Sequence, residues 1–197
     1  MKLYPAVLLP AWWRRDDWRF PAATAAIVGL GYLPYVAALG TGALGFLPEY
    51  LTSPEDHNIG LRALLTYPFG FTGEVARGVA MALLFAAMAA VLVIIGRRAR
   101  QDPPGLWRAS ALAVGAYLLL VPTAMHPWYV GWVVPFLCVR PSPAWLWFSG
   151  AVTLSYVAAP LPWWAWLLEY GPLYALLLAS TVRLARRAPR ALALRPS

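Results

Sequence analysis

Apolar runs of near-bilayer length recur along this chain, and they constrain its fold more than any other feature. A membrane-spanning helix needs about 20 mostly apolar residues, because the hydrocarbon core of a bilayer is about 30 Å thick. The runs lie at 21–39, 74–96, 109–124, 129–139, 144–159 and 165–184, and a shorter one lies at 2–13. None alternates over ten-residue segments as barrel strands do. The sequence therefore predicts an all-α polytopic membrane helix bundle, with about six transmembrane helices plus a partial N-terminal one.

Composition supports this class, and residues 1–197 are expected to form a single transmembrane domain. The chain is 61% hydrophobic and only 12% charged, whereas soluble domains average about 25% charged residues. A net charge of +8 could suggest nucleic acid, but the arginines cluster at the ends of apolar runs, as topology signals do. We therefore expect no nucleic-acid partner. The single cysteine, Cys138, lies within an apolar run, so no disulfide framework exists.

The distribution of charge predicts an orientation, because Lys and Arg prefer cytoplasmic loops. If consecutive helices alternate in direction, thirteen of the sixteen basic residues share one side: Arg14, Arg15, Arg19, Arg97, Arg98, Arg100, Arg108, Arg140, Arg183, Arg186, Arg187, Arg190 and Arg195. The other side holds Lys2, Arg62 and Arg77, together with five of the eight acids: Glu49, Glu55, Asp56, Glu74 and Glu169. The C-terminal tail is therefore predicted to be cytoplasmic. Residues 40–73 are predicted to form an extracytoplasmic loop.

That loop contains the first group of candidate site residues. Tyr50, Glu55, His57, Asn58 and Arg62 combine carboxylate, imidazole, amide and guanidinium groups. Such groups suit recognition of sugar hydroxyls or proton transfer. The simpler interpretation is that a polar outer loop is only solvated. Arg62 is either an ordinary loop charge or a phosphate clamp.

The second group surrounds the segment Met125–Trp132, which separates two apolar runs. Pro127 disfavours a helix through this point and pushes His126 out of the α region. Trp128 and Tyr129 could stack on the apolar face of a sugar or line a lipid groove. Lys2 lies on the same predicted side and either snorkels to the headgroups or contacts a lipid phosphate. The alternative for His126 is an interfacial imidazole that only satisfies a neighbouring carbonyl.

Other catalytic signatures are missing from the sequence. We find no Gly-rich phosphate loop, no Gly-x-Ser-x-Gly elbow and no Cys/His zinc pattern. The pair Asp56-His57 is by itself a weak metal signal. We therefore predict no metal site and no cofactor.

Several of these segments, taken in order, resemble a known family. The start Lys2-Leu3-Tyr4-Pro5, a short basic turn, a long outer loop with Asn58-x-Gly60 and the turn His126-Pro127-Trp128-Tyr129 look like the C-terminal half of a C-type integral-membrane glycosyltransferase. The resemblance is strongest to glycosyltransferase family 87 and to bacterial polyprenyl-phosphate-mannose-dependent mannosyltransferases.

The resemblance implies a multi-pass enzyme of the bacterial plasma membrane. It would move a sugar, mannose by analogy, from a polyprenyl-phosphate donor to a glycan or glycolipid acceptor on the extracytoplasmic face. Its partners would be that donor, the acceptor and membrane lipids. Lys2, Tyr50, Glu55, His57, Asn58, Arg62, His126, Trp128 and Tyr129 are then the substrate-binding candidates.

One departure from the family affects the catalytic residue. Members carry an acidic catalytic residue in the first outer loop, which would precede Lys2, so we expect this chain to be a fragment and assign no catalytic base. Two alternatives stay open, a non-catalytic protein that binds polyprenyl lipid and a fragment of a transporter or flippase. The predicted spans contain almost no charges of the kind that mark ion pathways, which argues against transport; Glu169 is the main exception, and it lies near an end of its span.

Overall fold

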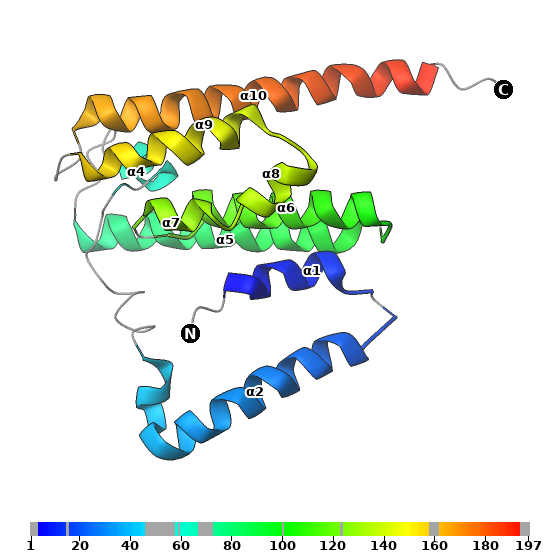
Figure 1. Ribbon diagram of the computed structural model, residues 1–197, viewed down its shortest axis with the longest axis vertical. Coiled ribbons are helices and arrows are strands. Elements are labelled where there is room, and N and C mark those ends of the chain that lie inside the picture. Colours follow the sequence, from blue (N-terminus) through cyan, green and yellow to red (C-terminus); the bar gives the residue numbers. More distant parts are fainter. Residues whose placement is uncertain are drawn as a thin grey trace. The chain divides into compact units, whose positions relative to one another are not determined.

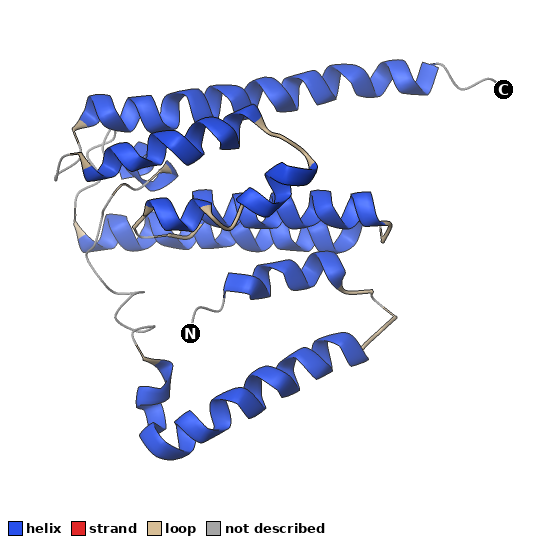
Figure 2. Ribbon diagram, viewed as in Figure 1, coloured by secondary structure: helices blue, strands red, loops and turns tan. Residues whose placement is uncertain are grey.

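The computed structural model describes residues 4–14, 16–45, 58, 60–66, 73–99, 101–122, 124–157 and 162–193. Across these ranges the chain forms helices joined by turns and contains no β-strand (Figure 2). The predicted all-α class is therefore confirmed. The chain divides into two compact units, Met1–Ala124 and Met125–Ser197.

Three helices are long and apolar enough to cross a membrane. They are α2 (Arg19–Leu39), α5 (Glu74–Arg98) and the segment Trp163–Arg183 of α10 (Trp163–Ala193). The predicted boundaries of all three lie within a few residues of these, except that α10 extends further toward the C-terminus. The protein is thus a helical membrane protein by length and composition, and the predicted count of about six spans is not confirmed.

The remaining predicted spans are shorter or interrupted. Residues 129–139 divide between α7 (Pro127–Val130) and α8 (Val134–Val139), with a turn at Gly131 and a proline in the first turn of each helix. Residues 144–159 begin as α9 (Pro143–Ala151) and tighten into the 3₁₀ helix η3 (Val152–Tyr156). In η3, side-chain hydroxyl groups compete with backbone N–H groups for the backbone carbonyl oxygens.

These hydroxyl contacts mark the point at which α9 tightens. Thr153 Oγ1 donates to Gly150 O at 2.6 Å, and Ser155 Oγ donates to Val152 O at 2.7 Å. The predicted 109–124 span corresponds to α6 (Pro103–Leu120), which includes two prolines and Arg108 in its first two turns.

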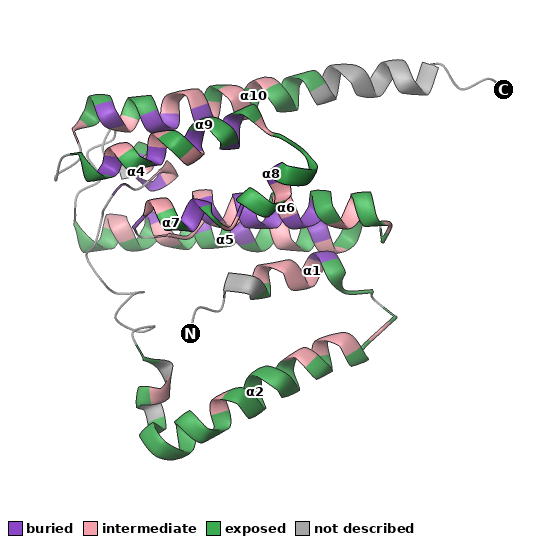
Figure 3. Ribbon diagram, in the orientation of Figure 1, coloured by how far each residue is buried: buried purple, intermediate pink, exposed green. Residues whose placement is uncertain are grey.

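In the first unit, α2 has no buried residue along its 21 positions (Figure 3). Apolar side chains cover all faces of α2. Its sequence pattern therefore does not mark one face for packing against another helix. Pro34 lies inside the helix, and α2 continues past it. The helix ends at Gly40, whose φ of 56° lies in the left-handed region that glycine adopts without steric cost.

The core of this unit is formed by α5, α6 and the short N-terminal helices η1 (Tyr4–Leu8) and α1 (Leu9–Trp12). Small side chains permit the close packing: the buried cluster is Ala11, Ile95, Ala109 and Ala113, with Val7, Val91, Leu92 and Ala99 against it. Trp12 Nε1 donates to Ser110 Oγ at 3.0 Å, and Gln101 Nε2 donates to Ala11 O at 3.3 Å. The short N-terminal run therefore packs on other helices of its unit.

The turn between α5 and α6 has a clear local cause. Asp102 is the N-cap of α6, and its carboxylate accepts from Gly105 N at 3.1 Å. Prolines at the next two positions need no intrahelical donor there. Within residues 40–73, the structure places η2 (Gly40–Leu44) and α4 (Leu61–Thr66). Both segments are short helical turns, and the described part of the loop contains no strand.

The second unit is built on a helical hairpin of α9 and α10 (Figure 1). The two helices are antiparallel, because Trp147 Nε1 donates to Leu168 O at 3.0 Å while Ala144 lines a pocket with Ser180 and Arg183. Phe148 is fully buried between them, with its ring centroid 5.1 Å from that of Tyr170.

Candidate functional site

The segment before α7 forms the break that the sequence predicts. His126 is the N-cap of α7 with φ −107° and ψ 151°, an extended conformation, and Pro127 occupies the first helical position. His126 O accepts from Tyr129 N at 3.0 Å, which closes the first turn of this short helix. Pro127 thus prevents a helix from running through this point from the preceding segment, and it also occupies the first position of α7, where no backbone N–H donor is needed.

The rings of His126, Trp128, Tyr129 and Tyr156 gather here, and we call this group the aromatic cluster. His126 stacks on Trp128, with ring centroids 4.3 Å apart and planes 11° from parallel. Tyr129 meets the His126 ring edge-on at 5.8 Å. Tyr156, from η3, lies 6.5 Å from the His126 ring and 6.3 Å from the Trp128 ring. The cluster therefore joins two segments of the second unit.

The rings of the aromatic cluster differ in their exposure to solvent. Tyr129 is buried and packs against Trp132 at a centroid distance of 5.0 Å. Trp128 and Tyr156 are each 57% exposed, and His126 is half-buried. An exposed indole stacked on an imidazole offers a flat apolar surface next to polar ring nitrogens. Such a surface is suited to stacking on a flat ring of a ligand.

Two candidates from the predicted outer loop lie in the first unit and are buried. Asn58 and Arg62 are each 4% exposed. Asn58 has a φ of 50°, in the left-handed region that asparagine tolerates better than most residues, and Arg62 lies on α4, which packs on α5 and α6. The interpretation of the loop as merely solvated is therefore wrong for these two residues. A buried arginine is expected to serve a specific polar contact.

The other candidates of the first group lie outside the described residues. These are Lys2, Tyr50, Glu55 and His57. Asn58 and Arg62 belong to the first unit and the aromatic cluster to the second, so the two groups of candidate residues are described separately.

Three further features of the second unit bear on the site; the sequence singled out Glu169 only in relation to transport and did not mark the other two. Tyr156 completes the aromatic cluster, although nothing in its sequence neighbourhood marks it. Glu169 is fully buried on α10 beside Tyr170, and a carboxylate inside a span is rare enough to mark a functional position. The third feature is a pocket lined by Arg140, Ser142, Arg183 and neighbouring residues. From the sequence alone, these arginines indicated only the orientation of the chain in the membrane.

Among the described residues, no group of three or more His, Cys, Asp or Glu side chains is placed to hold a metal ion. Comparisons with protein-family models, with curated proteins and with solved structures find no match to this chain.

Proposed function

We propose that this chain is part of a membrane glycosyltransferase that takes a sugar from a polyprenyl-phosphate donor on the extracytoplasmic face. The observation that carries the proposal is the aromatic cluster, in which an exposed Trp128 stacks on His126 at a helix break. Its sequence, His126-Pro127-Trp128-Tyr129, is also the most specific part of the resemblance to polyprenyl-phosphate-mannose-dependent enzymes. Three apolar helices of bilayer length supply the membrane setting that such a donor requires.

The chemistry would be displacement at the anomeric carbon. An acceptor hydroxyl attacks that carbon, the bond from the carbon to the donor phosphate oxygen breaks, and the polyprenyl phosphate leaves with the electron pair. The hydroxyl proton passes to a carboxylate base, which we do not assign to a residue of this chain. Trp128 would hold the sugar ring, and His126 would donate a hydrogen bond to the phosphate oxygen as its charge develops.

Removal of the Trp128 indole or of the His126 imidazole from the aromatic cluster is expected to weaken donor binding. Trp128→Ala and His126→Ala should each lower the affinity of the protein in nanodiscs for polyprenyl-phosphate mannose about tenfold, or ~1.4 kcal/mol. In the full-length enzyme the same variants should lower the rate of sugar transfer by about the same factor. Binding is measured by retention of radiolabelled donor on the purified nanodiscs.

Trp18→Ala is the matched control, because Trp18 is also a strongly exposed indole, at 70%, and lies in the first unit. This variant should bind the donor like the wild type. Unchanged donor binding in both Trp128→Ala and His126→Ala, with normal membrane insertion, would leave the aromatic cluster with an anchoring role only and overturn the proposal.

The proposed orientation makes a separate prediction. In a Cys138→Ala background, Gln101→Cys lies in the basic turn before α6 and Gly42→Cys lies in η2, and both positions are exposed. We expect a membrane-impermeant maleimide to label position 42 on intact cells. Position 101 should react only after the membrane is permeabilised, because arginine-rich turns are retained in the cytoplasm. Labelling of position 101 on intact cells would reverse the orientation.

A further inference from the structure

The second unit contains a basic pocket at the opposite end of the α9–α10 hairpin from Tyr156. It has a volume of about 240 Å³ and is lined by Arg140, Ser142, Pro143, Ala144, Leu176, Ser180 and Arg183. A single water needs only about 10–15 Å³ by the same measure, so the pocket has room for a polyatomic group. We call it the Arg140–Arg183 pocket.

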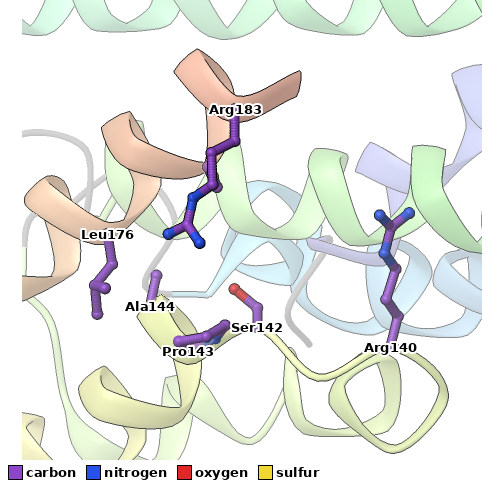
Figure 4. Close-up of a pocket in the computed structure, with 7 residues that line it drawn as sticks. Arg140, Ser142, Pro143, Ala144, Leu176 and Arg183 are labelled. Carbon is purple, nitrogen blue, oxygen red and sulfur yellow. The ribbon is translucent and has the colours of Figure 1, made fainter. Parts of the chain in front are cut away.

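Two arginines from different elements define the polar wall of the pocket. Arg140 follows α8, and Arg183 belongs to α10. Figure 4 shows Arg183 extending from α10 toward Ser142 and Ala144, with Arg140 on the other side of Ser142. Arg183 Nε donates to Ala179 O at 3.2 Å, which anchors the side chain and directs the terminal guanidinium nitrogens away from that carbonyl. Guanidinium groups are the preferred protein partners of phosphate oxygens.

The second unit supplies almost no negative charge to balance these arginines. Glu169 is its only Asp or Glu side chain, and it is fully buried. Glu169 and Arg183 are separated by 14 positions on the same helix, or about 21 Å along its axis at 1.5 Å per residue. The carboxylate therefore cannot reach the pocket, and no Asp or Glu side chain of this unit neutralises the two arginines.

Two serine hydroxyl groups complete the polar lining of the pocket. Ser142 is the N-cap residue of α9, and its hydroxyl oxygen accepts no capping hydrogen bond from the backbone N–H groups of the first turn. Ser180 Oγ donates to Leu177 O at 2.7 Å and is therefore an acceptor only. The start of α9 adds a weaker contribution, since backbone N–H groups in the first turn of a helix lack intrahelical acceptors.

The depth of the pocket identifies the chemical setting of the anion. The apolar segment of α10 begins at Trp163, which is 74% exposed, and ends at Arg183. Its 20 residue steps span about 30 Å, which matches the hydrocarbon thickness of a bilayer. With this segment across a bilayer, Arg183 would lie at the depth of the lipid phosphates, where basic pockets between helices bind acidic headgroups.

We propose that the Arg140–Arg183 pocket binds a phosphate group, supplied by the headgroup of an acidic phospholipid. This site is separate from the aromatic cluster at the other end of the hairpin and does not depend on the proposed transferase activity.

The test compares lipid retention by the purified full chain in mixed micelles, measured by native mass spectrometry with phosphatidylglycerol and phosphatidylcholine. Wild-type protein should retain phosphatidylglycerol at least tenfold more than phosphatidylcholine. The double variant Arg140→Gln/Arg183→Gln should lose most of this preference. The control Arg97→Gln/Arg98→Gln removes the same charge from exposed positions at the end of α5 and should retain it. Equal losses in the two double variants would mean diffuse surface charge and overturn the proposal.

A second variant tests the cavity without altering charge. Ser180→Phe should fill the pocket from α10 and lower the preference for phosphatidylglycerol at least threefold, while circular dichroism reports an intact helical fold. An undiminished preference in this variant would contradict binding inside the pocket.

Inorganic phosphate and glycerol 1-phosphate distinguish the source of the group. Displacement of phosphatidylglycerol by millimolar glycerol 1-phosphate, but not by glycerol, would support recognition of the phosphate. Tighter binding of inorganic phosphate than of the lipid would overturn the assignment to a lipid headgroup.

Discussion

Leu30→Arg is expected to prevent stable membrane insertion of α2. Leu30 lies near the middle of this 21-residue helix and is 68% exposed, while Ile27 and Leu33 on either side are 72% and 61% exposed. Leucine at the centre of a span favours insertion by about 0.5 kcal/mol, whereas arginine opposes it by about 2.5–3.5 kcal/mol. The difference of about 3–4 kcal/mol corresponds to more than a hundredfold change in the insertion equilibrium.

The measurement places a glycosylation acceptor directly after α2 through the changes G42N and L44T, and follows its modification in microsomes. Leu30→Phe is the control, because phenylalanine is also accepted at the centre of a span. Glycosylation should fall strongly in Leu30→Arg and stay at the wild-type level in Leu30→Phe. Equal glycosylation in the two variants would mean that α2 does not lie in lipid.

Phe148→Ala is expected to lower the free energy of unfolding of the second unit by about 3 kcal/mol. Phe148 is fully buried, and its ring contacts those of Trp145 and Tyr170 at centroid distances of 6.1 and 5.1 Å. Loss of a buried phenylalanine typically costs about 3–5 kcal/mol. We take the lower end, because lipid solvates an exposed apolar surface better than water does.

Titration with a denaturing detergent, followed by tryptophan fluorescence, measures this loss. Leu146→Ala is the control on the same helix, because Leu146 is 53% exposed; its effect should stay within about 0.5 kcal/mol, as for most exposed positions. A loss for Phe148→Ala no larger than that of the control would contradict the packing of α9 on α10.

Several local features follow from the sequence because their causes are local. Pro127 forces an extended His126, Asp102 caps α6 ahead of two prolines, and Gly40 ends α2. The long apolar runs set the boundaries of α2 and α5 to within about two residues, which is the usual uncertainty of helix ends. The number of membrane spans does not follow from the sequence in the same way. Hydroxyl contacts and paired prolines shorten apolar segments that are continuous by hydropathy alone.

The sequence by itself thus determined the helical membrane class, the breaks at prolines and glycines, and the asymmetric distribution of arginines. Only the tertiary structure decided which polar residues are buried and which rings meet. Arg140 and Arg183 are 43 positions apart and line one pocket because α10 folds back along α9. His126 and Tyr156 are 30 positions apart and meet because the segment of α7 packs against that of α9 and η3. In a uniformly apolar chain, periodicity does not distinguish the face that meets lipid from the face that meets another helix. Packing makes that choice, and it also creates the aromatic cluster and the Arg140–Arg183 pocket.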